Sequence, residues 1–323
     1  MLKKIYLSLL IVFCAMAMSF AQSDIQTEET PVKITDKSWA DRGFDFFISG
    51  GMLFGDKFNA NYYNGSNLNE NNLDYIFKST IYWYNDLKNI VAEYYPHISN
   101  TDEIYVNDPD AMDWNLHYKL SMMVSLGARY KLGKGWAVAL SYSFSRLTTS
   151  TQVLISSNAV IGNTKPQPVL ALVGKEDRSM IDLSASYLFS QVNPIAKPFV
   201  ELGIQFNYAK VKSFEAALLD ENRKMVDNGT FPLLNLSDKP SYDPYAQIYD
   251  YTFGGPGFGF SGAAGLKIVC GKYVSIDPTF YCYFGRLGIY QGKNASGQGE
   301  NKFTFNYGAQ IRIVMSDFFF SNK

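Results

Sequence analysis

Apolar and polar residues alternate strictly near the end of the chain, from Phe303 to Ile313. In this stretch Phe305, Tyr307 and Ile311 share one side of a strand, whereas the intervening positions are polar or small. A period of two with one apolar side predicts a β-strand between two different environments. Eleven residues also suffice for a tilted strand to cross a bilayer.

The same pattern recurs along the chain and predicts eight strands. Short connections follow the second, fourth and sixth strands, whereas long ones follow the first, third, fifth and seventh. We therefore predict an all-β fold, an antiparallel up-and-down eight-stranded transmembrane β-barrel with long, partly helical extracellular loops. The predicted strands cover 44–54, 118–130, 136–144, 178–189, 200–208, 258–268, 274–284 and 303–313.

The N-terminus carries the pattern of an export signal. Lys3 and Lys4 precede an apolar run that ends at Phe20, and small residues before Gln22 place signal-peptide cleavage after Ala21. We expect a signal peptide at 1–21, a periplasmic tail at 22–43, the barrel at 44–315 and a C-terminal tail at 316–323. The outer loops are expected at 55–117, 146–177, 210–256 and 285–301, with both termini in the periplasm.

Two loops show helical periodicity. Between residues 72 and 95 apolar residues recur at intervals of three and four, which predicts an amphipathic helix capped by Asn71 or Asn72 and ended by Pro96. Its apolar face either packs over the barrel mouth as a lid or docks a protein partner. A second helical stretch is expected at 213–226. The candidate docking residues are Ile76, Phe77, Tyr84, Leu87 and Val91.

Charged residues on the polar faces of the strands predict a paired network inside the barrel. An eight-stranded barrel is just wide enough to be filled by side chains. We expect Asp277 to lie beside Lys267 across a hairpin. The predicted lumen charges are Lys119, Arg129, Asp182, Glu201, Lys267, Asp277 and Arg312.

The remaining chemistry is sparse. The formal net charge of −1 offers no basic footprint for nucleic acid. No cysteine and histidine pattern suggests a metal, no cofactor motif is present, and no catalytic residues are assigned. His97 and His117 are the only histidines, and an outer-membrane lipid-modifying enzyme would have to depend on them.

The FAQ signal ending, the alternating strands and the final strand Tyr307–Ile313 resemble small outer-membrane barrels of Bacteroidota. The architecture is similar to that of OmpA/OmpX/OmpW-type eight-stranded barrels. The resemblance implies a Gram-negative outer membrane, with lipid and lipopolysaccharide as neighbours and a multi-protein assembly or secretion complex as partner. We therefore expect a non-enzymatic accessory or scaffold subunit that acts through its outer loops. The alternatives are a narrow channel for small or hydrophobic solutes, with a lateral opening near Gly262, Gly265 and Pro278, and the lipid-modifying enzyme.

Overall fold

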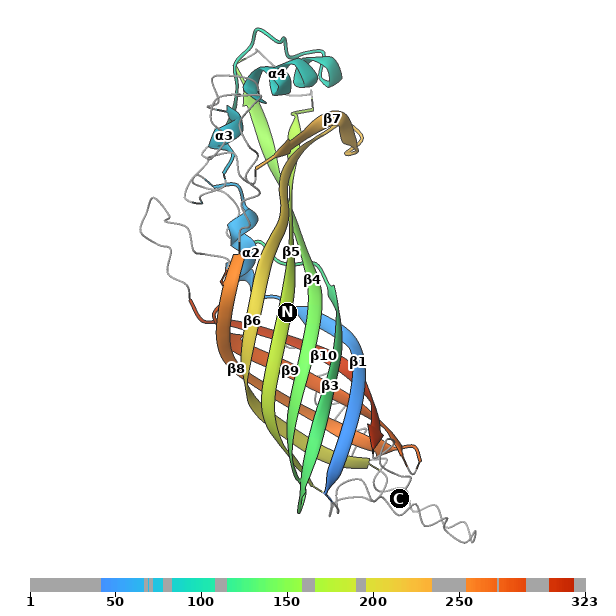
Figure 1. The fold of residues 1–323 in the computed structure, drawn as a ribbon. Coiled ribbons are helices and arrows are strands. Elements are labelled where there is room, and N and C mark those ends of the chain that lie inside the picture. Colours follow the sequence, from blue (N-terminus) through green and yellow to red (C-terminus); the bar gives the residue numbers. More distant parts are fainter. Residues whose placement is uncertain are drawn as a thin grey trace, which may run out of the picture.

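The computed structural model shows a barrel with a tall protrusion at one end (Figure 1). It describes residues 42–66, 69, 72–77, 83–107, 115–158, 166–189, 196–233, 254–271, 273–288 and 302–316. The predicted signal peptide, most of the N-terminal tail and residues 317–323 lie outside the described residues. Among the helices that the structure describes, none is both long and apolar enough to cross a membrane.

Eight antiparallel strands close into a ring, as the alternation predicts. β1 pairs with β3 on one side and with β10 on the other, which closes the barrel. The order around the ring is β1, β3, β4, β5, β6, β8, β9, β10. These strands span Gly43–Phe54, Ser121–Gly133, Trp136–Ser157, Val169–Leu188, Ala196–Leu219, Gly254–Val269, Val274–Gly285 and Thr304–Ser316, in the order β1, β3, β4, β5, β6, β8, β9, β10.

The outer wall of the ring is apolar and its interior is polar. Leu202 on β6 is 73% exposed, whereas Arg129 on β3 is 1% exposed. A soluble fold would have the opposite arrangement, because burial of apolar surface drives its folding. An apolar band around a polar interior is typical of a transmembrane β-barrel.

The tight turn between β3 and β4 defines what we call the turn end of the barrel. Gly133, Lys134 and Gly135 all have positive φ angles, of 95°, 54° and 84°, which glycine adopts with little cost. β1 begins and β10 ends at this same end, as the pairing of Asp45 with Ser316 shows. The opposite end is the loop end.

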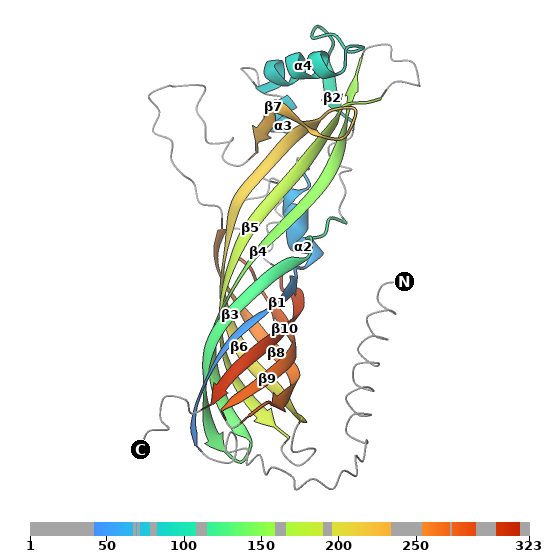
Figure 2. The same cartoon turned by 90° about the vertical axis from the view of Figure 1, so that its right-hand side faces the viewer.

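Three strands continue far beyond the ring at the loop end (Figure 2). β4 pairs with β5 as far as Leu154 and Val169, and β5 pairs with β6 as far as Val169 and Leu219. The prediction of a loop at 146–177 is therefore wrong for most of its length. Residues 146–157 contain several Thr, Val and Ile residues, which favour strands, although their outward side is no longer apolar.

The helix expected at 213–226 is also absent from the structure. Residues up to Leu219 continue β6, and the chain then turns at Asp220 and returns as β7 (Met225–Pro232), which pairs with β6. Glu, Ala and Leu favour a helix, but here they pair with strands on both sides. The long-range pairing overrides local propensity.

The first long connection holds the helices. α2 (Lys57–Ala60) and the 3-10 helix η1 (Asn61–Tyr63) lie at the rim, and α3 (Asp74–Phe77), α4 (Trp83–Tyr94) and β2 (Ile104–Val106) lie higher (Figure 1). The side chain of Asn72 accepts a hydrogen bond from the amide of Asp74 at 3.0 Å, so it caps the first of the predicted helical turns. The region formed by α3, α4, β2, β7 and the distal parts of β4, β5 and β6 is called the protrusion below.

Candidate functional site: the barrel lumen, its mouth and the protrusion

Charged residues fill the lumen near the turn end. Arg129 donates to Asp45 through Nη2 at 3.1 Å, and the ammonium of Lys131 lies 3.3 Å from the other oxygen of the same carboxylate. Arg129 Nη2 also lies 3.7 Å from Asp277 Oδ2. Lys267 is buried and interacts electrostatically with Asp277, as the hairpin geometry leads one to expect. Asp45 and Lys131 were not in the predicted set.

A second polar layer lies in the middle of the lumen. Arg312 donates to Glu201 at 2.7 Å, and the Gln205 amide donates to Asp182 at 2.7 Å and to the Tyr281 hydroxyl. Side chains of this layer line a cavity of about 20 Å³. Such a volume holds about one water molecule. This cavity is therefore too small for a solute larger than water.

Lys119 differs from the other six predicted lumen charges. It is exposed and precedes the start of β3, and its amide donates to Thr148 at 2.8 Å. Tyr118, which was expected to face outward, instead reaches inward to Glu176. The inward and outward alternation thus changes phase just before β3, and Lys119 lies outside the lumen.

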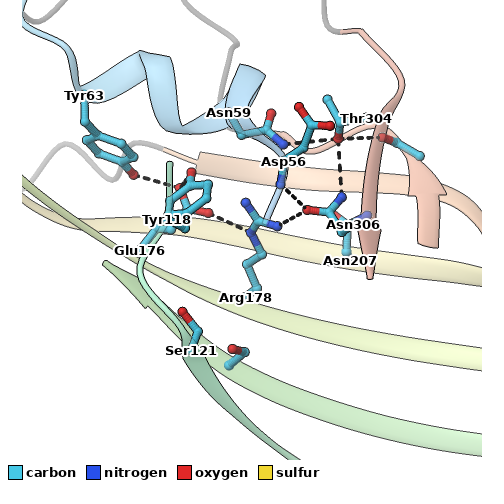
Figure 3. A network of polar contacts seen from close by, with 12 residues as sticks. Asp56, Asn59, Tyr63, Tyr118, Ser121, Glu176, Arg178, Asn207, Thr304 and Asn306 are labelled. Atoms are coloured by element: carbon cyan, nitrogen blue, oxygen red, sulfur yellow. Dashed lines mark hydrogen bonds and ion pairs between the residues drawn. The ribbon is translucent and has the colours of Figure 1, made fainter. Parts of the chain in front are cut away.

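A buried carboxylate organises the mouth of the barrel (Figure 3). Glu176 accepts hydrogen bonds from the hydroxyls of Tyr63 at 2.9 Å and Tyr118 at 2.8 Å. The guanidinium of Arg178 donates to the same carboxylate at 2.6 Å through Nε and to Asn306 Oδ1 at 2.7 Å through Nη1. These contacts join η1, β5 and β10 across the opening.

The segment before η1 is fastened to β10. The amide of Asp56 donates to Asn306 Oδ1 at 3.1 Å, and the side chain of Asn59 donates to Thr304 Oγ1 at 3.1 Å. The Asp56 side chain also caps α2 by accepting from the amide of Phe58 at 2.8 Å. We call residues 56–63 the mouth segment. It closes the mouth with polar contacts (Figure 3).

Burial and the nearby charge of Glu176 raise the pKa of Tyr63 well above its ordinary value. Both effects disfavour a phenolate, because a buried anion beside a carboxylate is poorly solvated. Tyr63 is therefore a hydrogen-bond donor throughout the neutral range. The pattern of the sequence does not identify Glu176 and Arg178 as site residues, because residue 176 lies in a predicted loop and the fourth predicted strand begins at 178.

The predicted docking face of the loop helix is buried inside the protrusion. Ile76, Leu87 and Val91 have no exposed surface, and Phe77 and Tyr84 pack against the same core. The face is thus occupied by the chain itself and is not open for a partner. α4 lies at the tip of the protrusion, so it is not the expected lid over the barrel mouth (Figure 1).

Contacts from several strands hold α4 in place. The rings of Trp83 and Phe231 meet edge to face with centroids 5.7 Å apart. The hydroxyl of Tyr95, just after the helix, donates to the carbonyl of Leu219 at 2.6 Å. The apolar residues of the protrusion therefore belong to one hydrophobic cluster that continues down into the loop end of the barrel.

The two histidines do not form a shared site. His97 is half-buried beside the ring of Tyr95, whereas His117 is exposed near the rim. Within the described part of the chain, no group of His, Cys, Asp and Glu side chains is arranged to hold a metal ion.

The expected lateral opening is not present in the described strands. β8 pairs with β9 on both sides of Pro278, at Gly265 with Thr279 and at Ile268 with Ile276. Pro278 itself lies opposite Ile311 of β10. The two strands keep one register across Pro278, although the pairing of β8 with β9 is interrupted at Leu266 and Lys267.

No protein-family model matches the chain, and no curated protein matches it. Among solved structures, it is similar to Neisserial surface protein A, with 9% identity, a TM-score of 0.35, and coverage of 84% of this chain and 96% of that one. The outer membrane protein OprG from Pseudomonas aeruginosa has 11% sequence identity and a TM-score of 0.29, and the match covers 86% of this chain and 95% of that one. The attachment invasion locus protein Ail of Yersinia pestis, solved in complex with the heparin analogue sucrose octasulfate, has 9% sequence identity and a TM-score of 0.30. The match covers 85% of this chain and 98% of that one.

At these low sequence identities, no binding or transport property of the similar proteins is transferred to this chain. The closed ring of eight strands, its apolar outer wall and its polar interior are those of an outer-membrane β-barrel.

Proposed function

We propose that this protein is a non-enzymatic accessory or scaffold subunit of a multi-protein outer-membrane complex, and that its protrusion is the docking element. The protrusion faces the outside of a Gram-negative cell and both termini lie in the periplasm, because short turns of such barrels face the periplasm and long connections face outward. The Bacteroidota origin stays a prediction from the signal ending and the final strand.

One observation carries this proposal. The mouth segment is bonded across the opening through Glu176 and Asn306, while three strands rise past it into a protrusion whose buried apolar residues form one hydrophobic cluster with those of the mouth. A closed mouth offers no advantage to a channel. A rigid cored element above the surface is suited to hold a partner, since ordering it costs no further entropy on binding.

The surface available for docking is the exposed side of α4. Its exposed residues are polar or acidic and recur at intervals of three and four: Asn85, Asp86, Asn89 and Glu93. The opposite side is buried, so the helix is held in one orientation. We assign the partner contact to this acidic side and infer a partner surface with basic residues.

The first experiment is purification of the tagged protein from its native membrane in mild detergent, followed by mass spectrometry. We expect a stoichiometric set of partners. The double charge reversal D86K/E93K should release them. The matched reversal E221K/D227K changes two exposed residues near the β6–β7 turn and should retain them. Recovery of the wild-type protein alone would overturn the proposal.

Two further measurements separate this proposal from the alternatives. Planar-bilayer recordings of the purified protein should show no ion steps, whereas regular steps would favour a channel. The lipid A mass spectrum of cells that carry H97A/H117A should equal that of wild-type cells. A difference would favour an outer-membrane lipid enzyme.

A further inference from the structure

Four cations gather on the outer wall of the barrel, just above the apolar band on β4, β5 and β6. Arg146, Lys175, Lys210 and Lys212 all project on the lipid-facing side of their strands, because each shares the parity of the exposed apolar residues below it. We call these four residues the rim cation cluster. Asp177 lies among them, and Glu215, which pairs with Val173, lies on the same outward side beside Lys175.

Strand register places the cluster at the edge of the membrane. Trp136, Tyr187 and Val200 form one row near the turn end, and Arg146, Asp177 and Lys210 form another row ten residues further along the three strands. Ten residues at about 3.3 Å each cover roughly 33 Å of strand, and a tilt of about 40° reduces this to roughly 25 Å along the barrel axis. The apolar band of such barrels is about 25 Å tall.

The residues between the two rows confirm that the band ends at this level. Leu140 on β4, Leu183 on β5 and Leu202 on β6 are exposed and apolar. The outward positions just below the cations are aromatic or hydroxylated: Phe144 precedes Arg146, and Tyr208 precedes Lys210. Tyr142, the next outward residue of β4, shares a hydrogen bond with Ser179 at 3.1 Å. Aromatic residues mark the interfacial layer of membrane barrels.

Asp177 neutralises only part of the cluster. Arg146 donates to both oxygens of this carboxylate, at 2.7 Å and 3.0 Å, and the ammonium of Lys212 lies 4.0 Å from it. Within the described residues, Lys175 and Lys210 make no ion pair. Four cations against Asp177 and the nearby Glu215 leave an excess positive charge, and the Arg146 and Lys212 side chains stay 58% and 44% exposed.

A β-bulge sets the position of Lys212. The β5–β6 register shifts between Lys175 and Glu176, where Lys175 pairs with Ser213 and Glu176 pairs with Val211. The extra residue on β6 is Lys212. Bulges re-aim side chains and bend the strand, and this one sets Lys212 beside Asp177 instead of directly opposite a β5 residue.

We propose that the rim cation cluster binds the phosphate group of an outer-leaflet glycolipid, such as the lipid A part of lipopolysaccharide. The acyl chains would lie against the apolar wall below, and the phosphate would lie at the level of the four cations. This combination of a flat apolar face and cations at headgroup height fits an anionic lipid better than a soluble anion. The proposal depends on the outward orientation proposed above and not on any protein partner.

Native mass spectrometry of the purified barrel tests this proposal. The protein is released from detergent in the presence of phosphorylated lipid A, dephosphorylated lipid A or inorganic phosphate alone. We expect the wild-type protein to retain phosphorylated lipid A and to bind the other two at least tenfold more weakly. Each cation near an anionic lipid contributes roughly a factor of five, so K175Q/K210Q/K212Q should lose about a hundredfold in affinity.

The control variant is K88Q/K134Q/K224Q, which removes three lysines that lie elsewhere on the molecule. It should bind phosphorylated lipid A as the wild type does. Folding of each variant is checked on a denaturing gel, on which the boiled, unfolded protein migrates more slowly than the unheated, folded barrel. Equal binding by K175Q/K210Q/K212Q and wild type would overturn the proposal. Binding of inorganic phosphate as tight as that of lipid A would overturn the assignment to a lipid.

Discussion

The hydroxyl of Tyr63 donates a hydrogen bond to the Glu176 carboxylate at 2.9 Å, across 113 residues of sequence. Both side chains are completely buried. The bond joins the 3-10 helix of the first long connection to β5, so it fixes the mouth segment over the opening. Removal of this one hydroxyl oxygen therefore tests how much the mouth contact stabilises the barrel.

Replacement of Tyr63 by Phe removes that atom. Glu176 then keeps its contacts with Tyr118 and Arg178 but loses one buried donor, which costs about 1–3 kcal/mol. We expect the free energy of unfolding in urea, followed by tryptophan fluorescence, to fall by this amount. Y105F changes an exposed tyrosine and should leave stability unchanged. Equal stability of both variants and wild type would show that the mouth contact contributes nothing.

The raised pKa of Tyr63 makes the mouth sensitive to alkali. Its folded-state pKa lies well above the ordinary value of 10.0 because of burial and the charge of Glu176. The stabilisation is therefore fully present below pH 10 and is lost as the pH rises above it, at about 1.4 kcal/mol per pH unit. We expect the stability difference between wild type and Y63F, measured by urea unfolding from pH 7 to 11.5, to shrink above pH 10. A constant difference would contradict this.

The ion pairs in the lumen and on the outer wall should differ in energetic weight. Asp45 is buried between Arg129 and Lys131, and D45N removes the carboxylate that pairs with both, although Arg129 still lies 3.7 Å from Asp277. Breaking a buried pair in this way costs about 3–5 kcal/mol. D177N breaks the pair with Arg146, whose side chain is 58% exposed, and should cost less than about 1 kcal/mol. Urea unfolding of the two variants side by side gives the comparison.

The apolar side of α4 should stabilise the protrusion and not the barrel. Leu87 is fully buried, and L87A should weaken the packing of the protrusion by about 2–5 kcal/mol. We expect faster proteolysis between residues 83 and 107, with unchanged gel migration of the unheated barrel. N89A alters the exposed side and should cleave at the wild-type rate. Loss of partners by L87A without faster cleavage would instead indicate direct docking by this face.

The strand count, the polarity of the lumen and the tight β3–β4 turn could be predicted from local sequence alone. Each follows from a period of two or from a few glycines, as in Phe303–Ile313 and around Lys134. Membrane strands show this pattern because their two faces meet different environments. The alternation at 121–133 and 274–285 has the same cause.

The protrusion could not be predicted from these local sequence patterns. Beyond Arg146 the outward face of β4 meets water, so the apolar alternation that identified the strand stops while its hydrogen bonding to β5 continues. Residues 213–219 have strong helix formers but pair with β5 and β7. The mouth network was missed for the same reason, since Glu176 lies in the part of β5 that looked like a loop.

The shared strands of barrel and protrusion have a mechanical consequence. β4 and β5 pair in one unbroken register from the turn end into the protrusion, and β5 and β6 do so apart from the bulge at Lys175, so the protrusion cannot swivel freely relative to the membrane-embedded wall. A partner bound at the tip would keep a fixed orientation relative to the bilayer. A pull along the strands would load many hydrogen bonds at once in shear, which resists far more force than opening them one by one.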